Sequence, residues 1–246
     1  MTALTGKRAL VTGAARGIGT AIAVELATRG ADVAITYQRS TDSAARVTGR
    51  IRSLGRKAVA IQADSADAAA VTSSVAAAVS HIGGLDILVN NAGVLYSAPL
   101  VETTLEQIDH LIAVNIRSVV LASQAALAYL PDGGRIVSLG SCLAERVAID
   151  YATVYSMSKS ALLSFTRGLA RELGPRGITV NLVHPGPTDT DMNPADSAGA
   201  DGLTALTALG RYSRVGDIAS PVGFLVGPTA GNITGTGITV AGGMNA

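Results

Sequence analysis

Short apolar runs rich in valine, isoleucine and leucine alternate with helical patterns along the whole chain of 246 residues. The runs are RALVT at 8–12, DVAITY at 32–37, KAVAIQA at 57–63, LDILVNNAG at 85–93, GRIVSLGS at 134–141, GITVNLVHPG at 177–186 and GITVA at 237–241. Each is apolar over most of its length, which indicates strands of a parallel sheet buried on both faces. We therefore predict an α/β fold: one doubly wound domain over residues 1–246, with about seven parallel strands and helices on both faces.

The segments between these runs have helical patterns. An alanine-rich stretch at 65–83 is interpreted as a packed helix, because alanine is the strongest helix former. Two long helices are expected at about 104–130 and 151–174, and both carry more apolar positions than one face of a sheet needs. These surplus positions favour pairing between subunits.

Composition excludes several classes of function. Hydrophobic residues make up 48% of the chain and charged residues 15%, as in a globular protein with a large core. The net charge of +1 gives no reason to expect nucleic acid or a charged membrane as partner. The single cysteine, Cys142, suits a reducing compartment, and no window approaches the roughly 18 apolar residues of a membrane span. With an N-terminal apolar run too short for a signal peptide, we expect a soluble cytoplasmic protein.

A glycine-rich turn, TGAARGIG, lies between the first strand and the first helix. Gly13, Gly17 and Gly19 permit a tight turn and close approach of the backbone, and the helix N-terminus presents free N–H groups to a phosphate. A glycine cluster alone is weak evidence, but its place between strand and helix is the context that a dinucleotide requires. The turn predicts a Rossmann-type nucleotide site at the carboxyl ends of the strands.

The residues after the second strand indicate which dinucleotide binds. An acid at the end of this strand would favour NAD, whereas arginine accommodates the 2′-phosphate of NADP. The strand ends at Tyr37 and is followed by Arg39, while Arg16 projects from the glycine turn. Asp32 stands at the beginning of the strand, too far to reach the ribose. We predict NADP(H) in preference to NAD(H), although both arginines could simply be solvated.

Tyr155 precedes Lys159 by four residues, so a helix would place both on one face. Taken alone, the pair is more simply a surface feature above an apolar stripe of Ala161, Leu162 and Phe165. A role in proton transfer requires further residues.

Several motifs together resemble the classical short-chain dehydrogenases/reductases. TGAARGIG, NNAG at 90–93, Asn115, Ser141, YSMSK at 155–159 and HPGPTDT at 184–190 occur in the order seen in that family. The resemblance covers essentially the whole chain and is similar in detail to bacterial 3-oxoacyl-carrier-protein reductases. It implies a reductase or dehydrogenase acting on CH–OH and C=O groups, commonly assembled as a homotetramer.

The resemblance implies a catalytic tetrad of Asn115, Ser141, Tyr155 and Lys159. It implies cofactor contacts from Gly13, Arg16, Gly17, Ile18, Gly19, Arg39, Asp64, Ser65, Asn91, Gly93, Tyr155, Lys159, Pro185, Gly186, Thr188 and Thr190. Two positions depart from the family pattern: Ala241 where Asp is usual, and Thr188 where a branched aliphatic residue is common. Neither removes a catalytic group.

This tetrad explains the Tyr155–Lys159 spacing. Reduction of a ketone needs hydride at carbon and a proton at oxygen, and a free tyrosine has a pKa near ~10. A lysine cation, with the oxidised nicotinamide, is expected to lower the pKa of Tyr155, which then acts as general acid or base. Ser141 would hold the substrate oxygen, Lys159 would reach the cofactor ribose, and Asn115 would hold a water that relays protons.

Other candidates fit less well. Tyr151 has no lysine four residues later and is assigned to pocket wall or surface, and Ser138 lies farther from the end of its strand than Ser141. Cys142 is more simply a small buried hydrophobe than a nucleophile. The three histidines are scattered without ligand spacing, so no metal site is predicted.

Two other functions remain as alternatives: a non-catalytic dinucleotide-binding regulator and a 3-oxoacyl-carrier-protein reductase. Enoyl reductases of the superfamily place the lysine seven residues after the tyrosine. With Lys159 as the lysine, the tyrosine would stand at position 152, where the chain has Ala152. The full tetrad disfavours the regulator. LAYLPDGGR at 127–135 has no lysine to dock an acidic carrier protein, although Arg176 could contribute charge.

The substrate is expected to be a small hydrophobic carbonyl compound or alcohol. A largely apolar pocket is predicted from Val94, Leu95, Leu143, Val147, Met192 and the loop from Asn193 to Arg211. The whole segment at about 188–211 is rich in glycine, alanine and aspartate, and we expect it to be a mobile substrate loop.

Overall fold

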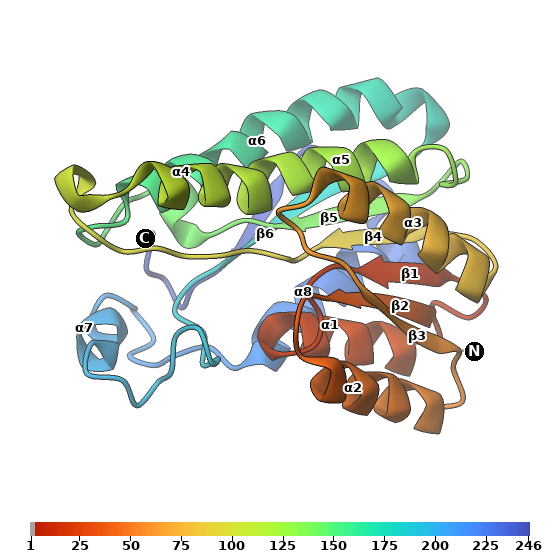
Figure 1. The fold of residues 1–246 in the computed structure, drawn as a ribbon, viewed down its shortest axis with the longest axis horizontal. Helices are drawn as coiled ribbons and strands as arrows, with labels where there is room; N and C mark the ends of the chain where they lie inside the picture. The colour runs from red at the N-terminus through yellow and green to blue at the C-terminus, as the bar shows by residue number, and fades with distance from the viewer. Residues whose placement is uncertain (1–2) are drawn as a thin grey trace.

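Seven parallel strands form one sheet in the order β3-β2-β1-β4-β5-β6-β7 in the computed structural model, which describes residues 3–246 (Figure 1). The strands are β1 Arg8–Val11, β2 Asp32–Tyr37, β3 Ala58–Gln62, β4 Ile87–Asn90, β5 Arg135–Leu139, β6 Thr179–Pro185 and β7 Gly237–Val240. Because β1 pairs with both β2 and β4, the strand order reverses there, at the point where doubly wound sheets bind ligands. The predicted fold class is confirmed.

Helices cover both faces of this sheet, with α3, α5 and α6 on one face and α1, α2 and α8 on the other (Figure 1). The α-helices are α1 Gly17–Thr28, α2 Thr41–Ser53, α3 Ala68–Ile82, α4 Leu105–Ile112, α5 Ser118–Ala126, α6 Thr153–Leu173, α7 Ala200–Ala205 and α8 Val215–Leu225. None of the helices within residues 3–246 has the length and apolar character needed to cross a bilayer.

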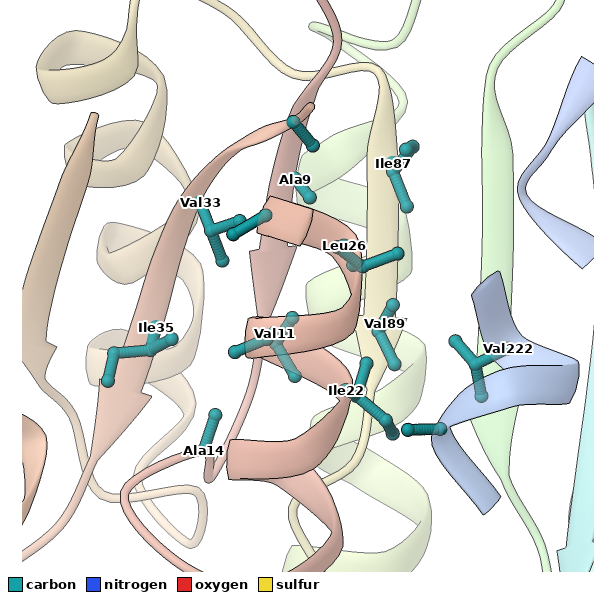
Figure 2. Close-up of a cluster of buried hydrophobic side chains, with 14 of the residues drawn as sticks. Ala9, Val11, Ala14, Ile22, Leu26, Val33, Ile35, Ile87, Val89 and Val222 are labelled. Carbon is teal, nitrogen blue, oxygen red and sulfur yellow. The ribbon is translucent and has the colours of Figure 1, made fainter. Parts of the chain in front are cut away.

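Strand β1 shows why the strands are apolar throughout. Val11 points into a cluster with Ile22 of α1 and Val222 of α8 (Figure 2). Leu10, its neighbour, packs on the opposite face against Val75 of α3. Successive side chains of a strand point to opposite faces, so a sheet covered on both sides needs apolar residues at both positions.

The alanine-rich segment forms α3, as predicted. Its N-cap, Asp67, accepts hydrogen bonds from Ala69 N–H at 2.8 Å and Ala70 N–H at 3.1 Å. Val71 and Val75 on its inner face are buried in the core. The cap and the buried face identify it as a packed helix rather than a linker.

The long helical region predicted at 104–130 contains a π-helical turn, η2 Ala113–Arg117, between α4 and α5. A capping box of Thr104 and Gln107 begins the region. The π turn carries Asn115, whose side chain is fully buried. Such turns occur often at functional sites, because they redirect a side chain without ending the helix.

One predicted boundary is wrong. Helix α6 begins at Thr153 rather than at Tyr151, whose φ of 62° places it in the left-handed region, outside the helix. The segment at about 188–211, interpreted as a mobile substrate loop, contains the short helix α7, and its mobility stays a prediction. Its composition, rich in small and polar residues, gives little periodic signal for a helix.

Candidate active site

A cavity of about 460 Å³ opens at the carboxyl ends of the strands, where ligands of doubly wound sheets bind. Most of the predicted cofactor-binding residues line it. They are Gly13, Arg16, Gly17, Ile18, Gly19, Arg39, Asp64, Ser65, Asn91, Gly93, Lys159, Pro185 and Thr190. The structure therefore brings the carboxyl ends of six strands, β1 to β6, to one place, and the glycine turn follows the first of them.

The glycine turn is built for close backbone contact. Gly13 and Gly17 have φ of 63° and 55°, in the left-handed region that favours glycine. A Cβ on Gly13 would lie 2.9 Å from the Cα of Ala92, and one on Gly19 would lie 2.5 Å from Asn91 Nδ2. Helix α1 begins at Gly17, so its free N–H groups stand at the cavity as a phosphate site requires.

Two arginines line the end of the cavity near β2. Arg16 and Arg39 are both exposed, and Arg16 Nη1 lies 3.8 Å from the carboxylate of Asp191. Asp32 lies at the start of β2, where it accepts a hydrogen bond of 2.6 Å from Arg56. As expected, Asp32 lies at the opposite end of the strand from the nucleotide site, and its carboxylate binds Arg56 there. Two cations are thus available to a phosphate.

Asp64, after β3, lies beside these arginines. Its carboxylate accepts hydrogen bonds from Ala66 N–H and from Gln38 Nε2, each at 2.8 Å. The backbone bond from Ala66 is the largest cause of the lowered pKa of Asp64, and Gln38 and Arg39 act in the same direction. The carboxylate is therefore ionised and fixed, with an orientation suited to accept hydrogen bonds from a base.

The NNAG turn is fastened to the end of β1. Thr12 Oγ1 accepts hydrogen bonds from Asn91 N–H at 3.0 Å and Ala92 N–H at 3.1 Å. Asn91 Nδ2 donates to the Thr12 carbonyl at 2.8 Å. Thr12 was not among the predicted site residues, although its place directly after a strand was a signal for it.

Three predicted residues meet at Gly93. A Cβ on Gly93 would lie 3.3 Å from Lys159 Nζ and 3.4 Å from Asn115 Oδ1, so glycine leaves room between the backbone and these two side chains. Lys159 Nζ donates to the Leu139 carbonyl at 2.9 Å and lies 5.9 Å from the centre of the Tyr155 ring. Helix α6 thus presents Tyr155 and Lys159 together, as their spacing predicted.

Burial controls the pKa values of this pair. Removal from water raises the pKa of Tyr155 to about 12, with the Ser141 side chain acting in the lowering direction, and lowers the pKa of Lys159 to about 8. The expected lowering of the Tyr155 pKa by Lys159 is wrong for this structure, because the desolvation of the phenolate outweighs favourable interactions. At neutral pH Tyr155 is neutral and Lys159 is mostly cationic.

The other predicted residues lie behind the cavity surface. Asn115 and Ser141 are buried, and neither they nor Tyr155 form part of the lining. Ser141 caps the short helix η3 Cys142–Ala144, with Oγ accepting from Leu143 N–H at 3.1 Å. Thr188 is also buried, and its hydroxyl donates to the Gly186 carbonyl at 3.0 Å. The structure therefore places neither Thr188 nor Gly186 at the cavity surface.

The predicted substrate pocket is only partly brought together. Val94 and Met192 line the cavity, whereas Leu95 and Val147 are exposed. Leu143 is buried in a cluster with Cys142 and Met244. Leu143 therefore does not line the cavity, and its place in the substrate pocket stays a prediction. Cys142 is a buried small side chain, as predicted, and burial raises its pKa.

Sequence reasoning missed two histidines. His110 of α4 lines the cavity and its Nδ1 lies 2.7 Å from the Tyr96 hydroxyl. His184, at the end of β6, is buried against Ser141. Both were set aside because they lack metal-ligand spacing. The position of His184 as the first residue of HPG, at a strand end, was a signal for proximity to the site.

Comparison with known proteins gives close matches over the full chain. The family model that matches residues 13–245 is described as enoyl-(acyl carrier protein) reductase. The cyclic-di-GMP-binding biofilm dispersal mediator protein of Escherichia coli is 42% identical over 246 residues, covering 100% of each chain.

Two similar solved structures contain a cofactor. A short-chain dehydrogenase from Burkholderia cenocepacia in complex with NADP is 56% identical, with a TM-score of 0.98 over 99% of this chain and 100% of that chain. A blue fluorescent protein from a metagenomic library, in complex with NADPH, is 50% identical, with a TM-score of 0.98 and the same coverage. The likeness therefore extends to both sequence and fold.

Proposed function

Because the chain belongs to the classical short-chain dehydrogenase/reductase family and is an NAD(P)-dependent oxidoreductase, we propose that it reduces a small hydrophobic ketone to a secondary alcohol with NADPH, and catalyses the reverse oxidation. One observation carries this proposal. A single cavity has Arg16 and Arg39 at one end and the Lys159 ammonium, with Tyr155 nearby on the same helix, at the other. An extended dinucleotide with a 2′-phosphate fits this arrangement of charges.

The residues present also fit the cofactor sterically. The left-handed Gly13 and Gly17 and the side-chain-free Gly93 keep open the space that the backbone and a bound dinucleotide would share. Gly13, Gly17 and Gly19 would hold the pyrophosphate, Asp64 the adenine and Lys159 the nicotinamide ribose. NADPH supplies the hydride for the reaction.

Tyr155 acts as the general acid. Its raised pKa keeps the proton on the phenol at neutral pH, so that it is ready for the oxygen of a ketone. Ser141 donates a hydrogen bond to the same oxygen and holds it in line. The Lys159 cation stabilises the phenolate that forms, and Asn115 supports the turn in which Gly93 and Val94 lie.

The decisive experiment is the oxidation of NADPH, followed by absorbance, with a panel of hydrophobic aliphatic and aromatic ketones. Turnover of at least one ketone by the wild-type protein, and its loss in Tyr155→Phe, is the expected result. Absence of turnover with every ketone and every matching alcohol would count against a catalytic function.

Reduction of a carrier-protein thioester is a less favoured candidate. Arg176, the cation that could contribute to a basic docking patch, is paired with Asp132 at 3.2 Å and donates to the Leu127 and Leu130 carbonyls. These contacts compete with the binding of an acidic partner, although the ion pair with Asp132 is exposed and therefore weak. Efficient turnover of an acetoacetyl carrier protein that collapses on addition of salt would reverse this preference.

Two further alternatives come from the comparisons. The matched family's description names enoyl reduction, but the spacing of four residues between Tyr155 and Lys159 favours carbonyl reduction. The Escherichia coli relative is named as a cyclic-di-GMP-binding mediator, which is the regulatory alternative. Displacement of NADPH by cyclic-di-GMP, in a protein that turns over no ketone, would favour that role.

We also propose that the chain assembles as a homotetramer. Large apolar side chains remain exposed on the outer helices, among them Leu105 and Ile112 of α4 and Met157 of α6. Light scattering should give four times 24.7 kDa, and Met157→Glu should shift the mass downward. A wild-type monomer at micromolar concentration would contradict the assignment.

A further inference from the structure

His184 lies in a slot that two glycines create. Its side chain is 1% exposed at the carboxyl end of β6. A Cβ on Gly140 would lie 2.4 Å from Nδ1, and a Cβ on Gly237 of β7 would lie 2.5 Å from Nε2. The imidazole is therefore held between β5 and β7 by close contacts on both sides, and it has little freedom to turn.

The polar end of this ring faces the backbone of Ser141. Nδ1 lies 3.0 Å from the Ser141 carbonyl oxygen and 3.3 Å from the Ser141 amide nitrogen. A neutral imidazole can donate to the first or accept from the second, according to its tautomer. Burial is the main cause of the lowered pKa of His184, which keeps the ring neutral at physiological pH.

We propose that His184 is a positioning residue for Ser141: the confined imidazole hydrogen-bonds the Ser141 backbone and so aims its hydroxyl at the substrate oxygen. This inference rests on the role of Ser141 in the proposed function. His184 itself does not line the cavity and lies behind Gly140, which does.

The contact from His184 adds to the hydrogen bonds that hold the backbone around Ser141. This backbone is extended, with φ of −162° at Ser141, and Gly140 just before it donates its N–H to the Val183 carbonyl at 2.8 Å. The Ser141 carbonyl also accepts from Ala144 N–H at 3.0 Å, within the turn that Ser141 itself caps. A displacement of about 1 Å at a positioning group can reduce the rate about a hundredfold.

Three substitutions separate the hydrogen bond from the volume of the ring. His184→Asn puts an amide where Nδ1 stands, and by flipping it can replace either tautomer. His184→Gln moves the amide toward Nε2, and His184→Leu removes it. We expect kcat for ketone reduction to fall about tenfold to a hundredfold in the Gln and Leu variants and less than about threefold in the Asn variant, with the NADPH Kd unchanged in all three.

Val183→Ala is the matched control, because it opens a void at the adjacent buried position of β6 without touching Ser141. It should lower Tm while keeping kcat. Retention of wild-type kcat by folded His184→Leu, a rate for His184→Asn as low as for His184→Leu, or an equal loss of kcat in Val183→Ala would each overturn the proposal. If His184→Leu does not fold, the comparison of the Asn and Gln variants decides.

Ser141→Ala distinguishes this inference from the proposed function. If that variant keeps turnover, the assigned role of Ser141 fails, whatever His184 does. If it loses turnover while the His184 variants keep theirs, only the positioning role fails. A crystal structure of His184→Gln should show the Ser141 hydroxyl displaced from its wild-type position, and an unmoved Ser141 would contradict the inference independently of any assay.

Discussion

The Asn115 side chain and the Val94 backbone are joined by two hydrogen bonds of 2.9 Å. Val94 N–H donates to Asn115 Oδ1, and Asn115 Nδ2 donates to the Val94 carbonyl. Nδ2 also donates to Ser158 Oγ at 3.0 Å. The side-chain amide thus pairs with both backbone groups of Val94, as a neighbouring strand would. It fixes the chain just after NNAG, where Gly93 lies close to Lys159. A water held by Asn115 stays a prediction and would use the remaining lone pair of Oδ1.

Asn115→Leu should destabilise the fold strongly, because both polar groups of Val94 lose their partners inside the protein. Each buried unsatisfied group costs about 1–3 kcal/mol, so the loss of both partners should lower the free energy of unfolding by about 2–6 kcal/mol. Denaturation with urea measures this loss, and kcat should fall as well.

Asn181→Leu is the control for this substitution. Asn181 is equally buried in β6, where it donates to the Ile233 carbonyl at 2.7 Å, far along the strand from the site. It should lose stability but keep kcat in the protein that remains folded. An Asn115→Leu variant as stable as wild type would show that the two hydrogen bonds between Asn115 and Val94 do not stabilise the fold.

Tyr155→Phe should abolish turnover while NADPH binding stays intact, because only the phenol hydroxyl is removed. General acid catalysis contributes about 10²–10⁴-fold, so kcat should fall by about that factor. Stopped-flow or steady-state rates, together with NADPH fluorescence titration, test both parts. Tyr151→Phe, at an exposed position before α6, should behave as wild type. Retention of most activity by Tyr155→Phe would remove it as the acid.

The rate of reduction should depend on pH through Lys159. The pKa of Tyr155, about 12, keeps the acid protonated across the working range, whereas the pKa of Lys159, about 8, lies within it. The kcat for reduction should therefore be constant at neutral pH and fall as pH rises above 8, when the cation is lost. The measurement is kcat at saturating NADPH over this range. A flat profile through 8 would be inconsistent with a charged Lys159 in the mechanism.

The lowered pKa of Lys159 makes the stability of the fold depend on pH. Its folded-state pKa of about 8 lies below the ordinary 10.5, so the unfolded chain binds more protons between these values. Stability contributed by this residue therefore rises with pH through that window, and Tyr155 acts in the opposite direction from pH 10.0 to about 12. The Tm of Lys159→Met relative to wild type should be highest at neutral pH and decrease as pH rises from 8 to 10.5. A difference that is independent of pH would contradict this.

NADPH should be preferred over NADH, with Arg16 and Arg39 together making the choice. Charge-assisted hydrogen bonds to the 2′-phosphate contribute about 1.5–3 kcal/mol each, and less where solvent competes, so two give about a hundredfold preference. Replacing both by Ala should raise KM for NADPH and leave KM for NADH little changed. The ratio of kcat/KM for the two cofactors measures the effect.

Arg46→Ala is the matched control for the cofactor prediction, since Arg46 is an exposed arginine of α2 outside the cavity. The ratio of kcat/KM for NADPH to kcat/KM for NADH in this variant should equal that of wild type. Tyr37→Asp should shift the ratio further toward NADH, by accepting the ribose hydroxyls and repelling the phosphate. A wild-type preference for NADH, or a double mutant with an unchanged ratio, would remove the arginines from this role.

The sequence by itself determined the sheet, the glycine turn and the joint presentation of Tyr155 and Lys159. These features depend on local geometry: apolar runs form strands, glycine permits the left-handed turn at Gly13, and four residues of helix bring two side chains onto one face. Each is encoded within a few neighbouring residues, so the pattern of residues suffices to predict it.

Only the tertiary structure decided how these groups are surrounded. Asn115 meets Val94 across 21 residues, His184 meets Ser141 across 43, and the C-terminal Met244 helps to bury Leu143, which the sequence had suggested for the pocket. Packing likewise reversed the expected direction of the Tyr155 pKa, since desolvation depends on everything that covers the phenol. Burial depends on how all the helices and strands pack together, so the spacing of neighbouring residues does not predict it.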